Sequence, residues 1–86
     1  MSWTLVWTER ARKDLRGLGK QAADRVVRGV ERFASSEQGD VKQLQGTDPP
    51  TWRLRIGDYR VLFAYDRTTG RVLVERVAPR GRAYRD

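Results

Sequence analysis

A short stretch near the middle of the chain alternates strictly between apolar and cationic side chains. Trp52, Leu54 and Ile56 are apolar, and Arg53 and Arg55 stand between them. A period of two is the spacing of a β-strand, in which successive side chains point to opposite faces of a sheet. The pattern therefore predicts a strand with one face in the core and one cationic face, as in a sheet covered by helices on one side only.

Further strands are predicted on both sides of this one. Residues 59–65 are almost all apolar, which is typical of a central strand, and residues 71–77 follow a hairpin loop that ends in glycine. Two shorter runs, 3–7 and 41–45, predict an opening strand and a second short strand. The polar residues 35–40 before the latter are expected to form a loop.

Two amphipathic helices are predicted between the opening strand and this loop. Ala11, Leu15 and Leu18 recur at helical spacing after the candidate N-cap Thr8, and a longer apolar stripe covers residues 20–34. The predicted fold class is therefore α+β: an N-terminal strand, a two-helix hairpin, then an antiparallel β-meander of three to four strands. At 86 residues, the whole chain (1–86) is expected to form a single domain.

The residue types that are missing exclude several kinds of site. The chain has no cysteine and no histidine, so disulfides, thiolate nucleophiles, zinc sites and histidine-based proton transfer are all excluded. We expect no metal and no cofactor. Because no apolar run approaches the roughly 20 residues of a membrane span, and no signal-length apolar run opens the chain, we expect a cytoplasmic protein with no membrane partner.

The basic residues indicate the kind of partner. The chain has 18 Lys+Arg against 11 Asp+Glu, for a net charge of +7, and only Lys13, Lys20 and Lys42 are lysines. Arginine presents a planar fork that matches phosphate oxygens and stacks on bases. The composition thus favours a nucleic acid or an acidic protein as partner, although GC-rich coding also enriches arginine.

One set of side chains could carry chemistry. Its members come from two strands and the tail, and a meander can bring them to one sheet face: Arg53, Arg55, Arg60, Arg80, Arg82 and Tyr84. Guanidinium groups around one concavity position a phosphodiester and stabilise the extra negative charge of its transition state. A tyrosine beside them can stack on a base or donate a proton. The alternative is a solvated cationic face, with the tyrosine capping the edge of the core.

Four segments, taken in order, also carry a family resemblance. They are the charged first helix (7–15), a basic-apolar-glycine segment (42–46), the strand that leads through Gly-Asp into Tyr-Arg (52–61), and the arginine–tyrosine tail (77–85). Together they resemble the RelE/ParE superfamily of bacterial toxins from type II toxin–antitoxin modules, within it the RelE-like messenger-RNA endoribonucleases.

The resemblance implies a microbial-RNase-like fold and ribosome-dependent cleavage of mRNA in the A site. A ribose 2′-hydroxyl would attack the adjacent phosphate, giving a cyclic phosphate and a free 5′-hydroxyl. By position, Arg60, Arg80 and Tyr84 match the family's catalytic residues. The basic residues assigned to substrate binding are Arg53, Arg55 and Arg82. The implied partners are the ribosome with its mRNA and a cognate antitoxin, in a hetero-oligomeric complex.

The sequence departs from the family pattern where many relatives carry a histidine, because Pro79 occupies that place. Arginine stays protonated at neutral pH and is therefore a poor general base, so the chain has phosphate-binding groups without an evident proton acceptor. Two alternatives therefore stay open. One is a ParE-like inhibitor of DNA gyrase, and the other is a catalytically weak or inactive basic RNA-binding module.

Overall fold

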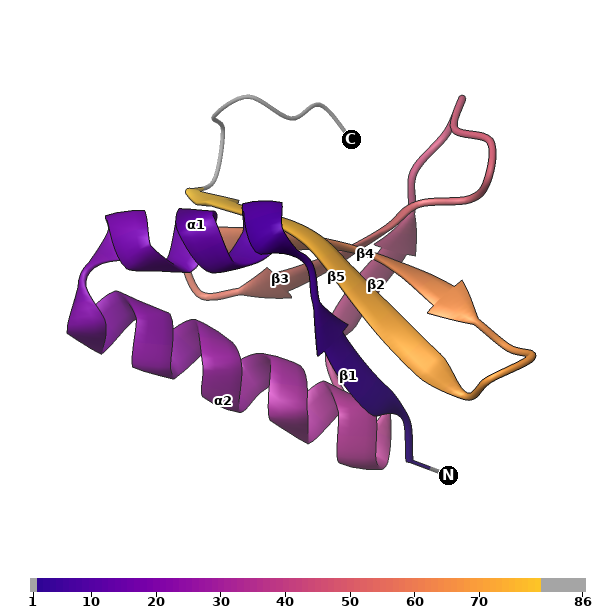
Figure 1. The fold of residues 1–86 in the computed structure, drawn as a ribbon, viewed down its shortest axis with the longest axis horizontal. Coiled ribbons are helices and arrows are strands. Elements are labelled where there is room, and N and C mark those ends of the chain that lie inside the picture. The colour runs from indigo at the N-terminus through magenta and orange to yellow at the C-terminus, as the bar shows by residue number, and fades with distance from the viewer. Residues whose placement is uncertain (1, 80–86) are drawn as a thin grey trace.

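Five strands form one sheet, and two helices follow the first strand (Figure 1). The structure, a computed structural model, describes residues 2–79. In chain order the elements are β1 (Thr4–Trp7), α1 (Glu9–Leu18), α2 (Lys20–Ser36), β2 (Asp40–Gln43), β3 (Trp52–Ile56), β4 (Tyr59–Asp66) and β5 (Arg71–Pro79). The strand order is β1-β5-β4-β3-β2. This arrangement confirms the predicted α+β fold class.

Strands β2 to β5 form the antiparallel meander, and β1 joins it parallel to β5. Such a parallel pair needs a crossover connection, which the two helices supply. Thr8 marks the point where the chain leaves the sheet. Its hydroxyl accepts a hydrogen bond from the Ala11 N–H at 3.2 Å and donates one to the Val74 carbonyl at 2.9 Å. One side chain thus caps α1 and ties its start to β5.

The observed elements differ from the predicted ones mainly at their ends. Strand β2 begins at Asp40 and ends at Gln43, so it is shifted towards the expected loop. One further ladder-like bond follows, since the Leu44 N–H donates to the Thr51 carbonyl at 2.9 Å. Helix α2 runs two residues further than expected and ends where Glu37 adopts a left-handed conformation with φ 58°.

The core lies between the helix hairpin and one face of the sheet. Its buried side chains come from both helices and from β3, β4 and β5: Ala11, Val26, Val30, Phe33, Leu54, Val61, Phe63, Val72, Val74 and Val77. Burying one such valine, leucine or phenylalanine contributes about 1.5–3 kcal/mol. The helices cover this face alone, which leaves the cationic side of β3 on the opposite face. Within residues 2–79, neither helix is long and apolar enough to cross a membrane.

Gly29 of helix α2 lies against the Ile56 side chain of the sheet. A Cβ built on this glycine would lie 2.6 Å from Cδ1 of Ile56, at the end of β3. Real Cβ atoms do not come that close to a neighbour, so any larger residue here would require the Ile56 side chain to shift. The missing side chain allows the backbone of α2 to lie directly over Ile56.

Candidate functional site

The strand registers place arginines side by side on the sheet face that the helices leave uncovered. Arg55 in β3 is the partner of Arg60 in β4, across the tight turn at Gly57–Asp58. On its other side, Arg55 is the partner of Asp40 in β2. Residues directly opposite each other in an antiparallel pair share a face. A row Asp40–Arg55–Arg60 therefore crosses three strands.

A second row lies two residues away along β3, at Arg53. Arg53 is the partner of Lys42 in β2 and of Leu62 in β4, and Leu62 is in turn the partner of Arg76 in β5. The two rows bring Arg53, Arg55 and Arg60 together, as the alternation in the sequence predicted. They also bring in Lys42, which the sequence analysis did not assign to the site.

Asp40 is the second residue that sequence reasoning missed. Its Oδ1 lies 3.7 Å from Nη2 of Arg53 and its Oδ2 lies 3.9 Å from Nη1 of Arg55. Like charges opposite each other on neighbouring strands are destabilising, and the carboxylate offsets this repulsion. The signal was present in the sequence, because Asp40 and Lys42 continue a period of two, but residues 35–40 were interpreted as a loop.

The cationic face is less open than expected at one position. The Arg53 side chain is only 5% exposed, whereas that of Arg55 is 32% exposed, and Arg60 is half-buried. A guanidinium as buried as Arg53 acts on a ligand mainly through its charge and by orienting Asp40. Arg55 and Arg60 are the members of the set that a phosphate can reach more easily.

The other three predicted site residues, Arg80, Arg82 and Tyr84, lie outside the described residues 2–79. Strand β5 ends at Pro79, the partner of Tyr59, and Ala78 is the partner of Arg60. The described chain therefore stops at the same end of the sheet as Arg55 and Arg60.

The described residues contain no group of three or more histidine, cysteine, aspartate or glutamate side chains that could hold a metal ion. The side chains gathered on this face are those that bind anions. What the arrangement can do chemically is hold a phosphate and stabilise added negative charge on it.

Comparison with known families decides which kind of protein carries this face. The chain matches the family model of the ParE toxin of the type II toxin–antitoxin system parDE over residues 5–84. The chain belongs to the ParE toxin family. It is therefore the toxin component of a type II toxin–antitoxin system and a member of the RelE/ParE superfamily, as the sequence resemblance implied.

Several solved structures contain chains with the same fold as this ParE-family toxin. It is similar to a chain of the archaeal RelE–RelB complex from Pyrococcus horikoshii, with a TM-score of 0.75 and 27% identity over 96% of this chain and 100% of the other. It is also similar to a chain of the toxin–antitoxin complex RelBE2 from Mycobacterium tuberculosis, with a TM-score of 0.83 and 27% identity over 93% of each chain.

A chain of the RelB–RelE antitoxin–toxin complex from Methanococcus jannaschii is 18% identical, has a TM-score of 0.67, and is matched over 86% of this toxin and 88% of that chain. At this identity the likeness concerns the fold alone. A search of curated proteins gave no match. The family model thus carries the name ParE, while these structures carry the name RelE.

Proposed function

We propose that this toxin is a ribosome-dependent mRNA endoribonuclease that inhibits translation. The observation that carries the proposal is the Arg55–Arg60 pair, held face to face across β3 and β4 on the uncovered side of the sheet. Cβ atoms of directly opposed residues are about 5 Å apart, which lets two guanidinium groups contact one phosphodiester. The similarity to the RelE–RelB and RelBE2 chains at 27% identity supports a RelE-like toxin.

The proposed reaction is attack of a ribose 2′-hydroxyl on the adjacent phosphorus. Arg60 and Arg55 bind the non-bridging oxygens and stabilise the negative charge that builds up on them. As the P–O2′ bond forms, water accepts the proton of the 2′-hydroxyl. The P–O5′ bond breaks, which leaves a 2′,3′-cyclic phosphate and a 5′-hydroxyl. In this scheme Arg80 adds to the phosphate clamp, and Tyr84 protonates the departing 5′ oxygen. Arg53 and Arg82 contribute to binding of the RNA, and the ribosome aligns the mRNA.

We also infer a cognate antitoxin and a hetero-oligomeric toxin–antitoxin complex. The similar chains come from RelE–RelB, RelBE2 and RelB–RelE complexes, each of which holds an antitoxin with its toxin. A net charge of +7 favours a partner segment rich in acidic residues.

The nuclease proposal is tested by expressing the toxin and mapping mRNA 5′ ends. Wild-type toxin is expected to arrest growth and to produce new ends that carry a 5′-hydroxyl. Arg60→Ala is expected to lower cleavage by about 10²–10³-fold, the usual loss for one transition-state contact, and Tyr84→Phe should also lower it. Arg71→Ala is the matched control, since this exposed arginine begins β5 at the other end of the sheet. Growth arrest without new mRNA ends would show that the proposal is wrong.

One observation favours a second function, inhibition of DNA gyrase, because the matching family model is that of the ParE toxin. A supercoiling assay with purified gyrase distinguishes the two functions. Inhibition of supercoiling by the wild-type toxin, together with unchanged mRNA ends in cells, would establish the gyrase target.

A further inference from the structure

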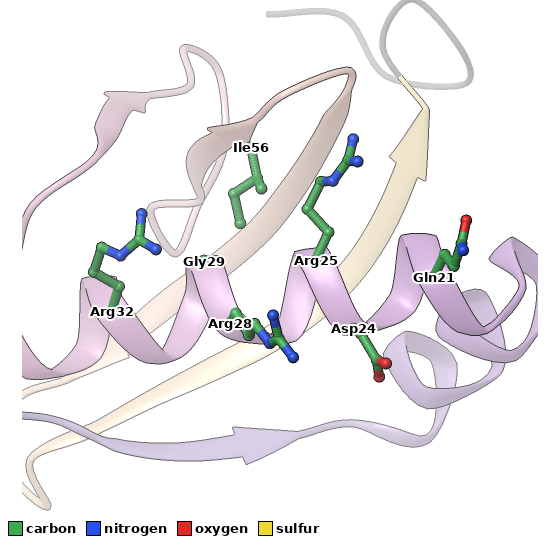
Figure 2. Close-up of a pocket in the computed structure, with 7 residues that line it drawn as sticks. All are labelled: Gln21, Asp24, Arg25, Arg28, Gly29, Arg32 and Ile56. Atoms are coloured by element: carbon green, nitrogen blue, oxygen red, sulfur yellow. The ribbon is translucent and has the colours of Figure 1, made fainter.

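A groove of about 580 Å³ lies along α2, on the helix-covered side of the sheet. Figure 2 shows Arg25 and Arg32 rising from the helix on either side of Ile56 in this groove. A second hollow, a pocket of about 570 Å³, lies at the start of β3, between the β2–β3 loop and the hairpin of β4 and β5. The pocket, unlike the groove, adjoins the cationic sheet face.

One wall of the pocket lies on the same sheet face as the arginines. In β4, Leu62 is the partner of Arg53, and Ala64 lies two residues further on, so both side chains point to that face. Ala64 is in turn the partner of Leu73 in β5, and this pair lines the pocket. The pocket therefore continues the cationic face towards the end of β4.

A carboxylate enters the pocket at an irregularity between β4 and β5. Leu62 is the partner of Arg76 and Phe63 is the partner of Val74, so Glu75 is the extra residue of a β-bulge. Bulges change the direction of a side chain and are common beside active sites. The Glu75 side chain is half-buried and lines the pocket.

Among residues 2–79, the Glu75 carboxylate has neither an ion pair nor a hydrogen bond. The other charged side chains of the pocket are already engaged. Asp66 accepts hydrogen bonds from the N–H and the hydroxyl of Thr68, at 3.2 and 2.6 Å, and the Arg67 guanidinium lies 4.9 Å from the centre of the Tyr65 ring. A half-buried anion without a partner is unfavourable, and a ligand with N–H donors would remove this cost.

We propose that the pocket binds one base of the RNA and that Glu75 selects a base with an exocyclic amino group. Cytosine, adenine and guanine each present an N–H₂ group, from which a carboxylate accepts a hydrogen bond, whereas uracil presents carbonyl oxygens that a carboxylate repels. Pro49, Pro50 and Trp52 also line the pocket, and they supply apolar surface for the faces of the base.

The position of Glu75 fits a nucleotide close to the scissile phosphate. Glu75 lies three residues along β5 from Ala78, the partner of Arg60, which corresponds to about 10 Å along the strand. A phosphate is a poorer occupant of the pocket, since the carboxylates of Glu75 and Asp66 repel it. This inference deepens the proposed function and rests on it for the identity of the ligand, a single-stranded RNA.

The test measures binding of the full-length toxin to fluorescently labelled RNA pentamers by anisotropy. Pentauridylate is compared with three pentamers whose central base is cytosine, adenine or guanine. Wild-type toxin is expected to bind at least one of the three about fivefold or more tightly than pentauridylate. In Glu75→Gln the amide offers a donor as well as an acceptor, so this preference should fall below about twofold. The control Glu31→Gln makes the same change of charge on the exposed side of α2 and should keep the preference.

The ratio of affinities decides the outcome, because removing a negative charge tightens the binding of every RNA. Ala64→Leu leaves the charge unchanged and fills the pocket, and it should also abolish the preference. Circular dichroism establishes that each variant is folded. Equal affinity of wild-type toxin for all four pentamers, or a preference that both Glu75→Gln and Ala64→Leu leave intact, would overturn the inference. Because the pentamers are measured without ribosomes, the nuclease proposal fails separately, in the mapping of mRNA ends.

Discussion

The Asp14 carboxylate on α1 accepts a hydrogen bond from the backbone N–H of Val77 in β5, at 2.9 Å. Strand β1 pairs with β5 from Arg71 to Val74, and beyond that point no strand within residues 2–79 pairs with this edge of β5. The same carboxylate oxygen accepts a second bond from Nε of Arg76, also at 2.9 Å. A helix side chain thus replaces the missing strand and fixes α1 against the sheet.

Replacing Asp14 with alanine should destabilise the toxin substantially. The change leaves the Val77 N–H and the Arg76 guanidinium without this acceptor, and the side chain is only 19% exposed. Hydrogen bonds to charged groups contribute about 1.5–3 kcal/mol, so we expect the free energy of unfolding to fall by that amount in urea titrations. Glu9→Ala is the control, because it removes an exposed pair with Arg16 and an acidic residue from the first turn of α1, and it should cost less than about 1 kcal/mol. Equal effects of the two substitutions would contradict this role for Asp14.

The same contact should make stability depend on pH in the acid range. Burial disfavours the charged carboxylate, but the hydrogen bonds from Arg76 and Val77 and the charges of Arg76 and Arg10 outweigh it, so the pKa of Asp14 lies below its ordinary value of 3.8. A lowered folded-state pKa gives stability that is present above the unfolded-state pKa and lost as pH falls through the folded-state value. The difference in unfolding free energy between wild type and Asp14→Ala should be constant near neutral pH and shrink below about pH 4. Urea titrations at several pH values measure it, and a difference that grows on acidification would contradict the prediction.

The strands with a strong side-chain pattern were predictable from sequence, and the contacts between distant elements were not. The alternation from Trp52 to Ile56 fixed which face of β3 is cationic, because the period of two leaves no other choice. The period of two at Asp40 and Lys42 indicates a strand, but it does not show that Asp40 lies beside Arg53 and Arg55. That contact depends on the register of β2 against β3, and β2 is only four residues long.

The same limit applies to α2 and to the edge of β5. The helical period predicted the apolar stripe of α2. The approach of Gly29 to Ile56, and so the groove, depends on how the helix lies across the sheet. Asp14 looks like an ordinary exposed helix acid in the sequence, and only the tertiary fold reveals Val77 as its partner.

The two glycines inside helices should respond in opposite directions to alanine. Ala at position 29 puts a Cβ 2.6 Å from Ile56 Cδ1 and 3.0 Å from its Cγ1 and Cγ2, whereas a Cβ at Gly17 meets nothing within 4 Å. Alanine gains up to about 1 kcal/mol over glycine in a helix, but overpacking costs about 1–3 kcal/mol. Gly17→Ala should therefore raise the melting temperature, and Gly29→Ala should lower it. A higher melting temperature for both variants would mean that Ile56 yields without cost.

Asp40 should restrain the binding of RNA by the cationic face. Its carboxylate lies within 4 Å of Arg53 and Arg55, so a phosphate that approaches these arginines meets a negative charge already in place. Asp40→Asn removes that charge and keeps the size of the side chain. Exposed ion pairs are worth about 0.2–1 kcal/mol, so we expect Kd for a labelled single-stranded RNA to fall about two- to fivefold at low salt, and the gain to shrink as salt screens the face.

The matched control for Asp40→Asn is Asp24→Asn, which makes the same change of charge on α2, in the groove rather than on the sheet face. Fluorescence anisotropy over a range of salt concentrations compares the two variants. The asparagine at position 40 should tighten binding more than the one at position 24, because Asp40 lies against Arg53 and Arg55 of the sheet face. An equal gain for both would show that RNA responds to net charge alone, and that Arg53, Arg55 and Arg60 do not form a defined site for it.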